Sequence, residues 1–350
     1  MDLNTILEKA IETEASDIFI IAGLPVTFKI SGGLRRIGET MMKPDDITAC
    51  AEEIYAAGHR EKTNFEKKID DDFSISIPSL GRFRVNIFRQ RGSWSAVIRV
   101  IKFGIPDPAK LGIPENVLSL ADNKNGLVLV AGTAGSGKST TLACMIDRIN
   151  RSREAHIITM EDPIEYLHSH NKSIVTQREV FIDTASYLDS LRSALRESPD
   201  VILLGEMRDY ETISAAVTAA ETGVLLFSTL HTSSVANTIN RIVDVFPGEQ
   251  QGQIRGQLAQ LIKGVVCQQL VMTEEGLTPV FEVMRSTPAV QNMIREGKYH
   301  QLEATMQSAA AEGMVTMDAS LYELFRQRKI SKETALGACN NYEFMKKRLG

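Results

Sequence analysis

One segment carries the residue types of a phosphate-binding P-loop: Gly132-Thr133-Ala134-Gly135-Ser136-Gly137-Lys138-Ser139. An apolar run, 126–131, precedes it and a helix-compatible run, 140–149, follows, which is the context such a loop needs. The glycines let backbone N–H groups and a helix N-terminus face an anion. The sequence therefore predicts that a nucleoside triphosphate binds here; a plain glycine-rich turn is the alternative. The expected contact residues are Thr133, Ala134, Gly135, Ser136, Gly137, Lys138, Ser139 and Thr140.

Two of these side chains have specific expected tasks. Lys138 places a positive charge at the β- and γ-phosphates, and the Ser139 hydroxyl is a ligand for Mg²⁺. Hydrolysis also needs carboxylates that hold Mg²⁺ and activate water. Glu206 follows the apolar run 201–204 in the form of a Walker B element and is the predicted metal carboxylate. Asp200 precedes that run, so we expect it at the opposite edge of the sheet.

Another acidic residue, Glu165, follows the apolar run 157–160 and is the predicted activator of the attacking water. Carboxyl ends of parallel strands meet at one edge of a sheet, so Glu165 and Glu206 are expected near the P-loop. His231 follows the run 225–230. It is predicted either as a core histidine with satisfied ring nitrogens or as a contact to the γ-phosphate that relays the nucleotide state.

The elements that must position these groups fall into two predicted domains. Residues 1–102 are expected to form a small α+β domain, because short strands with period-two alternation occur beside two helical stretches. The helices are expected near 3–14 and 44–57, and the strands within 17–37 and at 73–77, 83–88 and 96–101. Gly104, Pro106, Pro108, Gly112 and Pro114 make 103–115 the expected interdomain linker.

The second predicted domain, 116–350, is a P-loop α/β domain. Its short, continuous apolar runs alternate with helical segments, which is typical of a parallel sheet covered on both faces. We expect helices from roughly Gln250 to the C-terminus. The fold class is therefore α/β, with a smaller α+β domain N-terminal to it.

Composition excludes several function classes. Of 350 residues, 43% are hydrophobic and 24% charged, as in an ordinary globular protein. No run approaches the roughly 20 apolar residues of a membrane span, so a cytoplasmic location is expected. The net charge of −5 argues against a general nucleic-acid binder, although a local basic patch leaves a DNA translocase open. That patch is Arg82, Arg84, Arg89 and Arg91. Four dispersed cysteines, Cys50, Cys144, Cys267 and Cys339, suggest neither a zinc site nor a disulfide framework.

Four segments together resemble the Walker A, Asp box, Walker B and His box of the secretion ATPase superfamily: 132–139, 159–166, 200–209 and 222–232. Over nearly its whole length the chain is similar to the type IV pilus retraction ATPases, the twitching-motility family. Residues 287–298 resemble the C-terminal signature linked in that family to retraction. The resemblance implies an N-terminal PAS-like domain, a flexible linker and a RecA-like ATPase domain with a helical C-terminus, assembled as a hexameric ring.

By the same resemblance, Glu165 is the general base, Glu206 the Walker B acid and His231 the His-box histidine. Arg84 and Arg99 match arginines that the N-terminal domain presents to the phosphates. ATP and Mg²⁺ are the implied cofactors. A homohexamer and an inner-membrane pilus platform protein are the implied partners. No direct nucleic-acid contact is expected, and the chain is expected to meet the inner face of the cytoplasmic membrane only through its partners.

Three positions depart from the family pattern. Val224 stands where the His box usually has an earlier histidine, Gln291 replaces an arginine of the C-terminal signature, and Phe19 stands where a histidine is common. The leading hypothesis is an ATPase motor for pilus retraction. A pilus-assembly or DNA-uptake ATPase, or a nucleotide-gated accessory subunit with little turnover, remain the alternatives.

Overall fold

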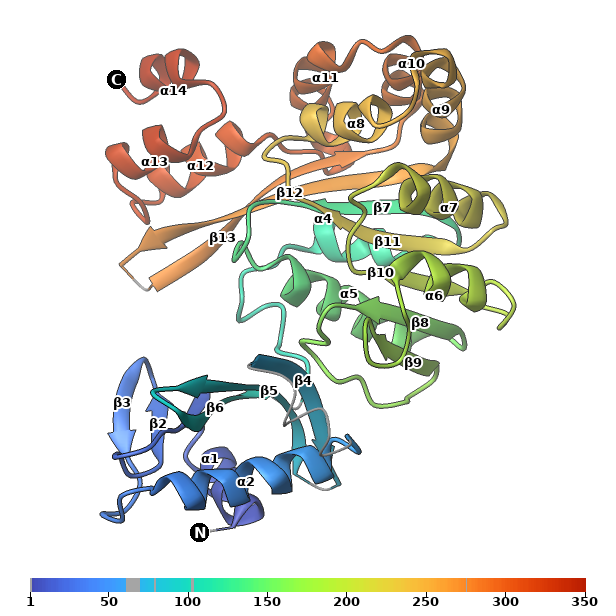
Figure 1. Ribbon diagram of the computed structural model, residues 1–350. Helices are drawn as coiled ribbons and strands as arrows, with labels where there is room; N and C mark the ends of the chain where they lie inside the picture. The colour runs from blue at the N-terminus through green and yellow to red at the C-terminus, as the bar shows by residue number, and fades with distance from the viewer. Residues whose placement is uncertain (1, 61–69, 79, 102–103, 275) are drawn as a thin grey trace. The chain divides into compact units, whose positions relative to one another are not determined.

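The computed structural model describes residues 2–60, 70–78, 80–101, 104–274 and 276–350. These form two compact units, Met1–Gly104 and Ile105–Gly350. Figure 1 labels their helices and strands. Residues 102 and 103, at the predicted domain boundary, lie outside the described residues.

Unit 1 is a six-stranded antiparallel sheet with the strand order β3-β2-β1-β6-β5-β4. Its strands are β1 (Asp17–Ile20), β2 (Thr27–Ile30), β3 (Gly33–Arg36), β4 (Asp70–Ile77), β5 (Gly81–Gln90) and β6 (Ser93–Ile101). Helices α1 (Leu3–Glu12) and α2 (Pro44–Ala57) lie along one face of this sheet (Figure 1). The mixed helix and strand content predicted for this part of the chain is confirmed.

The strands of unit 1 separate an apolar face from a polar one. Along β5, Phe83 and Val85 are buried in the core beneath the helices. Arg84 and Asn86 alternate with them and belong to the other face, since successive side chains of a strand point to opposite sides. The sheet therefore buries one side and leaves the other to charged and polar groups.

Unit 2 is built on a seven-stranded sheet with the order β13-β12-β7-β11-β10-β8-β9. Its strands are β7 (Gly126–Ala131), β8 (His156–Glu161), β9 (Ile174–Glu179), β10 (Val201–Leu204), β11 (Leu225–Leu230), β12 (Ile262–Thr273) and β13 (Gly276–Arg285). All pairings are parallel except β12 with β13. Every residue of β7, β10 and β11 is buried, as the continuous apolar runs predict.

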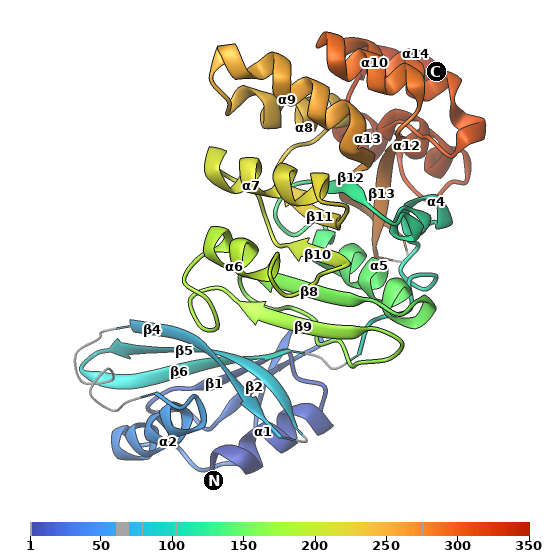
Figure 2. The same ribbon diagram turned by 90° about the vertical axis from the view of Figure 1, so that its right-hand side faces the viewer.

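Helices cover both faces of this sheet (Figure 2). Val128 and Val130 pack in one core with α4 (Glu115–Leu118) and α5 (Lys138–Ser152). Leu127 and Leu129 face the other core, to which four helices before the last strands and the C-terminal helices contribute. The four are α6 (Tyr187–Ala194), α7 (Tyr210–Glu221), α8 (Val235–Asp244) and α9 (Gly248–Leu261).

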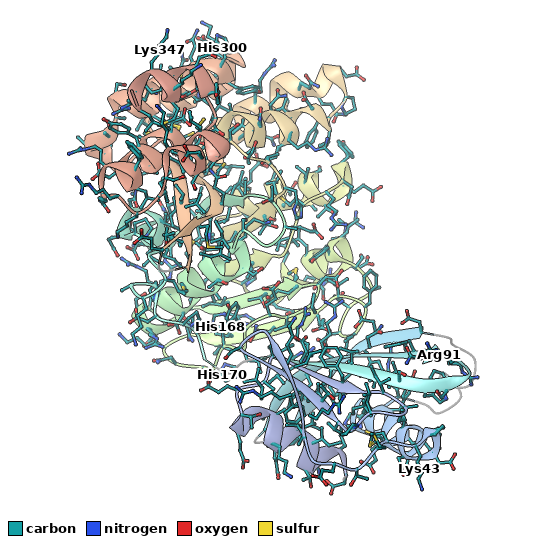
Figure 3. All side chains as sticks on the ribbon, turned by 90° about the vertical axis from the view of Figure 1, so that its left-hand side faces the viewer. Lys43, Arg91, His168, His170, His300 and Lys347 are labelled. Carbon is teal, nitrogen blue, oxygen red and sulfur yellow. The ribbon has the colours of Figure 1, made fainter. Side chains whose placement is uncertain are left out.

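The prediction of helices from about Gln250 onward is wrong for Ile262–Thr273 and Gly276–Arg285, which form the antiparallel strands β12 and β13. Residues of β12 pair with β7, which would otherwise be an edge strand of the sheet. This tertiary pairing makes β12 a strand instead of a helix. Helices follow β13 at α10 (Pro288–Glu296), α11 (Leu302–Ser308), α12 (Met317–Arg326), α13 (Lys332–Ala338) and α14 (Tyr342–Arg348). Figure 3 labels His300 and Lys347 among these last helices.

Part of the predicted linker packs on unit 2. Ile113 is buried, and Ile105 and Leu111 pack against the same core. The Cys144 thiol donates to the Pro106 carbonyl at 3.5 Å. Residues 105–115 are therefore an ordered start to unit 2.

All four cysteines carry free thiols, and three of them are buried. Within the described ranges, none of the helices combines the length and the apolar character that crossing a bilayer requires.

Candidate active site

The loop between β7 and α5 has the backbone of a phosphate cradle. Gly132, Gly135 and Gly137 adopt φ values of 150°, 76° and 88°, a region that other residues rarely enter. Space is limiting as well: a Cβ on Gly132 would lie 2.2 Å from the backbone oxygen of Gln268, and one on Gly137 would lie 2.8 Å from its Nε2. Gln268 of β12 thus forms the floor of the loop, and its Oε1 accepts from the Thr141 hydroxyl at 2.7 Å.

Helix α5 starts at Lys138, with Gly137 as its N-cap and no side chain bonded to the cap. The first N–H groups of a helix have no partner within it, and the helix dipole makes this end favourable for an anion. Ser136 adds a buried hydroxyl for which the structure shows no hydrogen-bond partner. These unsatisfied groups fit the oxygens of a nucleotide phosphate.

The Lys138 ammonium lies inside this loop, with 9% of the residue exposed. Its Nζ donates to the carbonyls of Gly132 at 2.8 Å and Thr133 at 2.9 Å. Burial lowers its pKa, while the charges of Glu206 and Glu165 oppose that shift. Lys138 therefore lies within the field of both predicted carboxylates.

A cavity of about 280 Å³ adjoins the P-loop. Its lining brings together the predicted residues Ala134, Gly135, Lys138, Ser139, Glu165, Glu206 and His231. Glu206 follows β10 and His231 follows β11, two adjacent parallel strands. Their side chains meet, with His231 Nε2 at 3.3 Å from Glu206 Oε2. Ser139 and Glu206 together offer the hydroxyl and carboxylate oxygens that Mg²⁺ takes beside phosphate oxygens.

Sequence reasoning missed several residues of this cavity. Arg208 Nε donates to Glu206 Oε2 at 2.5 Å, and Tyr187 of α6 lines the wall. Tyr166 OH lies 2.9 Å from Thr140 Oγ1. The sequence did offer a signal that Arg208 belongs to the site, since it stands two residues after Glu206. Tyr187 gave none, because only the fold brings α6 to the site.

His168 also lines the cavity and belongs to the segment that follows β8 (Figure 3). Burial lowers its pKa to about 4. It is therefore a neutral imidazole at physiological pH. Its Nδ1 is buried, and the structure shows no hydrogen-bond partner for it.

Glu161, at the end of β8, is a further acid of the cavity lining that sequence reasoning did not single out. Burial raises its pKa to about 7, and hydrogen bonds from Thr159 and Gln177 work against that rise. The distances are 2.7 Å from Thr159 Oγ1 and 3.3 Å from Gln177 Nε2, both to Glu161 Oε1. The Glu161 carboxyl group is thus fixed by two side-chain hydrogen bonds, four residues before Glu165.

Asp200 lies at the opposite edge of the sheet, as expected. It precedes β10. Its Oδ2 accepts a 2.8 Å hydrogen bond from the backbone N–H of His156, which is the first residue of β8. Val224 immediately precedes β11 and is buried in the core with 6% exposure. Both residues are at the end of the strands away from the P-loop, because β7, β10 and β11 run parallel.

The other two departures lie on a helix of unit 2 and on a strand of unit 1. Gln291 is on α10, where its Nε2 donates to Ser286 Oγ at 3.1 Å. Phe19 is a half-buried residue of β1 in unit 1.

Arg84 and Arg99 stand directly opposite each other on β5 and β6 of unit 1. Each is bound to an aspartate of the same sheet. Arg84 bonds Asp72 through Nε at 3.1 Å and Nη2 at 2.6 Å, and Arg99 Nε bonds Asp17 at 3.0 Å. Such neighbours fix the arginine side chains on the polar face of the sheet.

Comparisons with known proteins identify the family of the chain. The family described as "Type II/IV secretion system protein" matches residues 1–329. The chain is 43% identical over 336 residues to the type IV pilus retraction ATPase PilT of Pseudomonas aeruginosa, covering 96% of this chain and 97% of that one. It is 41% identical over 345 residues to a twitching motility protein of Neisseria gonorrhoeae, covering 98% and 91%. A crystal structure of the pilus retraction motor PilT with bound ADP matches with a TM-score of 0.91 at 43% identity, covering 99% of both chains. The chain therefore belongs to the type II/IV secretion system protein family and, within it, to the pilus retraction and twitching-motility ATPases.

Proposed function

We propose that this chain hydrolyses ATP to drive type IV pilus retraction. One observation carries the proposal: Lys138, Glu165, Glu206 and His231, from four separate segments, line a single cavity at the P-loop. That set supplies phosphate binding, metal binding and water activation together. The high similarity to proteins named as pilus retraction and twitching-motility ATPases supports the same function.

Binding uses the residues from Thr133 to Thr140. Backbone N–H groups of the loop and the start of α5 hold the phosphates, and Lys138 neutralises charge at the β- and γ-phosphates. Ser139 and Glu206 would hold Mg²⁺, which supplies electrostatic stabilisation of the phosphates when bound. The bound ADP of the PilT structure supports a nucleotide at this loop.

Hydrolysis requires a base near the γ-phosphate. Glu165 takes this role because it lines the same cavity as Lys138. Among the described residues its carboxylate accepts no hydrogen bond and joins no ion pair, whereas the Glu206 carboxylate is bonded by Arg208 and His231. Glu165 would orient and deprotonate the attacking water. His231, held beside Glu206, would contact the γ-phosphate and change its hydrogen bonds when that phosphate leaves.

The proposed domains are a PAS-like domain over 1–102 and a RecA-like ATPase domain over 116–350. The segment 103–115 joins them, and its residues 105–115 pack on the ATPase domain as part of unit 2. Arg84 and Arg99 would present their guanidinium groups to nucleotide phosphates. Assembly as a homohexamer, the form implied by the resemblance, would place such sites around a ring. Staggered closure of these sites would deform the ring as ATP is bound and hydrolysed.

The proposed partner is an inner-membrane platform protein of the pilus machine, turned by the ring so that pilins return to the membrane. The chain would work in the cytoplasm, at the inner face of the cytoplasmic membrane, and reach the bilayer only through that partner. We propose no direct nucleic-acid contact, and ATPase activity that added DNA leaves unchanged would agree with this.

Steady-state ATP hydrolysis by the purified protein tests the enzymatic part, with the oligomer mass recorded alongside. Glu165→Gln should reduce turnover at least a hundredfold while nucleotide binding is retained, since loss of a general base costs roughly 10²–10⁴ in rate. Lys138→Ala should abolish binding as well. Glu312→Gln, an exposed acid outside the cavity, is the matched control and should keep the parental rate. Parental turnover in Glu165→Gln would remove Glu165 from the mechanism.

A deletion strain tests the direction of the motor. Retraction predicts cells that keep excess surface pili and lose twitching. Cells without pili would instead select an assembly ATPase. Tight ATP binding by a hexamer with negligible turnover would select a nucleotide-gated accessory subunit.

A further inference from the structure

Two side chains of the edge strand β9 bond the segment that carries Glu165. Glu179 Oε2 accepts from the backbone N–H of Ile164 at 3.1 Å, before Glu165, and Gln177 bonds the segment beyond it. Gln177 Nε2 donates to the backbone carbonyl of Tyr166 at 2.9 Å and to Glu161 Oε1 at 3.3 Å. Its Oε1 accepts from the backbone N–H of His168 at 2.8 Å. A single amide thus bonds the segment on both sides of residue 167 and also bonds the carboxylate at the end of β8.

The same segment has a second set of anchors, near Glu165 itself. The backbone N–H of Glu165 stabilises the Glu161 carboxylate and, like the hydrogen bonds from Thr159 and Gln177, lowers its pKa. Tyr166 OH lies 2.9 Å from Thr140 Oγ1, on the helix that opens at the P-loop. Glu165 is therefore flanked by a carboxylate that Gln177 holds and a backbone carbonyl that Gln177 binds.

The position of Gln177 in the sheet explains how it reaches both groups. Gln177 pairs with Thr159 across β9 and β8, and Thr159 Oγ1 donates to the same Oε1 of Glu161. Gln177 is half-buried between the sheet and the Tyr166 segment. The β9 ladder itself is made by backbone groups, so these side-chain hydrogen bonds serve the segment and not the strand.

We propose that Gln177 is a positioning residue for ATP hydrolysis: it sets the place of the Glu165 carboxylate relative to the P-loop. The proposal rests on the function proposed above, with Glu165 as the base. A base must be within hydrogen-bond reach of the water it activates. A displacement of about 1 Å can cost on the order of a hundredfold in rate, so release of this segment is expected to affect chemistry more than binding.

The test compares Gln177→Leu with Thr176→Val, in the full-length protein. Leucine keeps approximately the volume of glutamine and removes all three hydrogen bonds. Thr176 is on the same strand, but its hydroxyl contacts His156 Nε2 at 3.0 Å instead of the Glu165 segment. Gln177→Leu should lower kcat about tenfold to a hundredfold, with KM for ATP and the Kd for ADP within twofold of the parent. Thr176→Val should change none of these values.

Combining Gln177→Leu with Glu165→Gln separates positioning from general structural damage. If Gln177 acts through Glu165, the double variant should have the same residual rate as Glu165→Gln alone, because the two effects cannot add. A further drop of tenfold or more in the double variant, or weakened ADP binding by Gln177→Leu, would show a structural role and overturn the proposal.

The two proposals fail in distinguishable ways. A Glu165→Gln protein with the parental rate refutes Glu165 as the base, whatever Gln177→Leu does. Loss of turnover in Glu165→Gln together with an unchanged kcat in Gln177→Leu refutes only the positioning role. An unfolded Gln177→Leu protein is identified by its far-UV circular dichroism, and Gln177→Met, which retains length without the amide, then provides the same comparison.

Discussion

His231 and Glu206 meet at the carboxyl ends of adjacent strands, with 3.3 Å between Nε2 and Oε2. His231 follows the last residue of β11, and Glu206 lies two residues beyond the end of β10. The pair connects the proposed metal carboxylate to the loop that leads into α8. If His231 contacts the γ-phosphate as proposed, departure of that phosphate would be transmitted through this side chain toward α8.

Replacing His231 by alanine should weaken the binding of ATP more than the binding of ADP. If the imidazole contacts the γ-phosphate, His231→Ala should lower kcat about tenfold to a hundredfold, as for other lost electrostatic contacts. Affinity for a non-hydrolysable ATP analogue should fall, and the Kd for ADP should stay within twofold. Equal losses for both nucleotides would assign His231 to the structure of the site. Calorimetric titration with each nucleotide measures the difference.

Adding a methyl group at Gly137 should damage the phosphate loop. Gly137 has φ 88°, and its Cβ would lie 2.8 Å from Gln268 Nε2. A left-handed backbone costs a residue with a Cβ about 1–2 kcal/mol, so Gly137→Ala should lower the free energy of unfolding by about that amount and weaken ADP binding. Gly248→Ala is the matched control, because nothing lies within 4 Å of its Cβ position. Urea unfolding and ADP titration of both variants check this, and an undisturbed Gly137→Ala protein would contradict it.

Restoring the family histidine at Val224 should affect stability and not nucleotide binding. Val224 is buried among apolar side chains at the start of β11. The six residues of β11 span about 20 Å, which separates Val224 from His231. Val224→His should lower the free energy of unfolding by about 1–3 kcal/mol, because the core offers the imidazole no partner. The Kd for ADP should not change. A tenfold change in that Kd would show coupling along the strand.

Glu282 makes stability depend on pH. It is a buried residue of β13 that lines a second cavity of about 250 Å³ with Glu303 and Asp318. Burial raises its pKa from 4.5 to about 7, helped by those two acids and opposed by the Val235 N–H and the Asn340 amide.

The sign follows from the raised pKa. Between about pH 4.5 and 7 the folded state keeps a proton that the unfolded state has lost, so stability falls as pH rises through this window. Glu282→Gln should reduce the loss between pH 5 and pH 7.5 by on the order of 3 kcal/mol. Glu161, with a pKa also raised to about 7, retains part of the slope. Urea unfolding at both pH values measures it, and an identical slope in parent and variant would refute the assignment.

Local sequence signals were sufficient where the chemistry or the pattern is contiguous. The P-loop, with its strand before and helix after, requires fixed residue types at fixed spacing, and the structure has it at Gly132–Ser139. Helix α2 spans Pro44–Ala57, close to its predicted range, because Pro44 can occupy the first turn and Asp45 and Asp46 favour the positive end of the helix dipole. Glu165, Glu206 and His231 meet because parallel strands end at one edge.

Features that depend on tertiary pairing were not predictable. The polar pair Gln268 and Gln269 interrupts the apolar pattern of β12. The fold explains both residues, because Gln268 accepts from Thr141 beside the P-loop and Gln269 donates to the Ala338 carbonyl. Strand β9 reads as the polar segment Ile174–Glu179, and its pairing with β8 makes it a strand. Gln177 and Tyr187 carry no local sign of a site, because segments distant in the chain bring them there.

Gln268, which lies against the P-loop, belongs to a strand that extends past its neighbour β7. Pairing of β12 with β7 ends at Cys267 and Ala131, while its pairing with β13 continues to Thr273 and Gly276 (Figure 1). The strand is twelve residues long, or about 40 Å, and Gln268 is the first residue beyond the pairing with β7. The Gln268 backbone oxygen and side chain close the space beside Gly132 and Gly137. A force that pulls on β12 would therefore act on the phosphate loop through this direct contact.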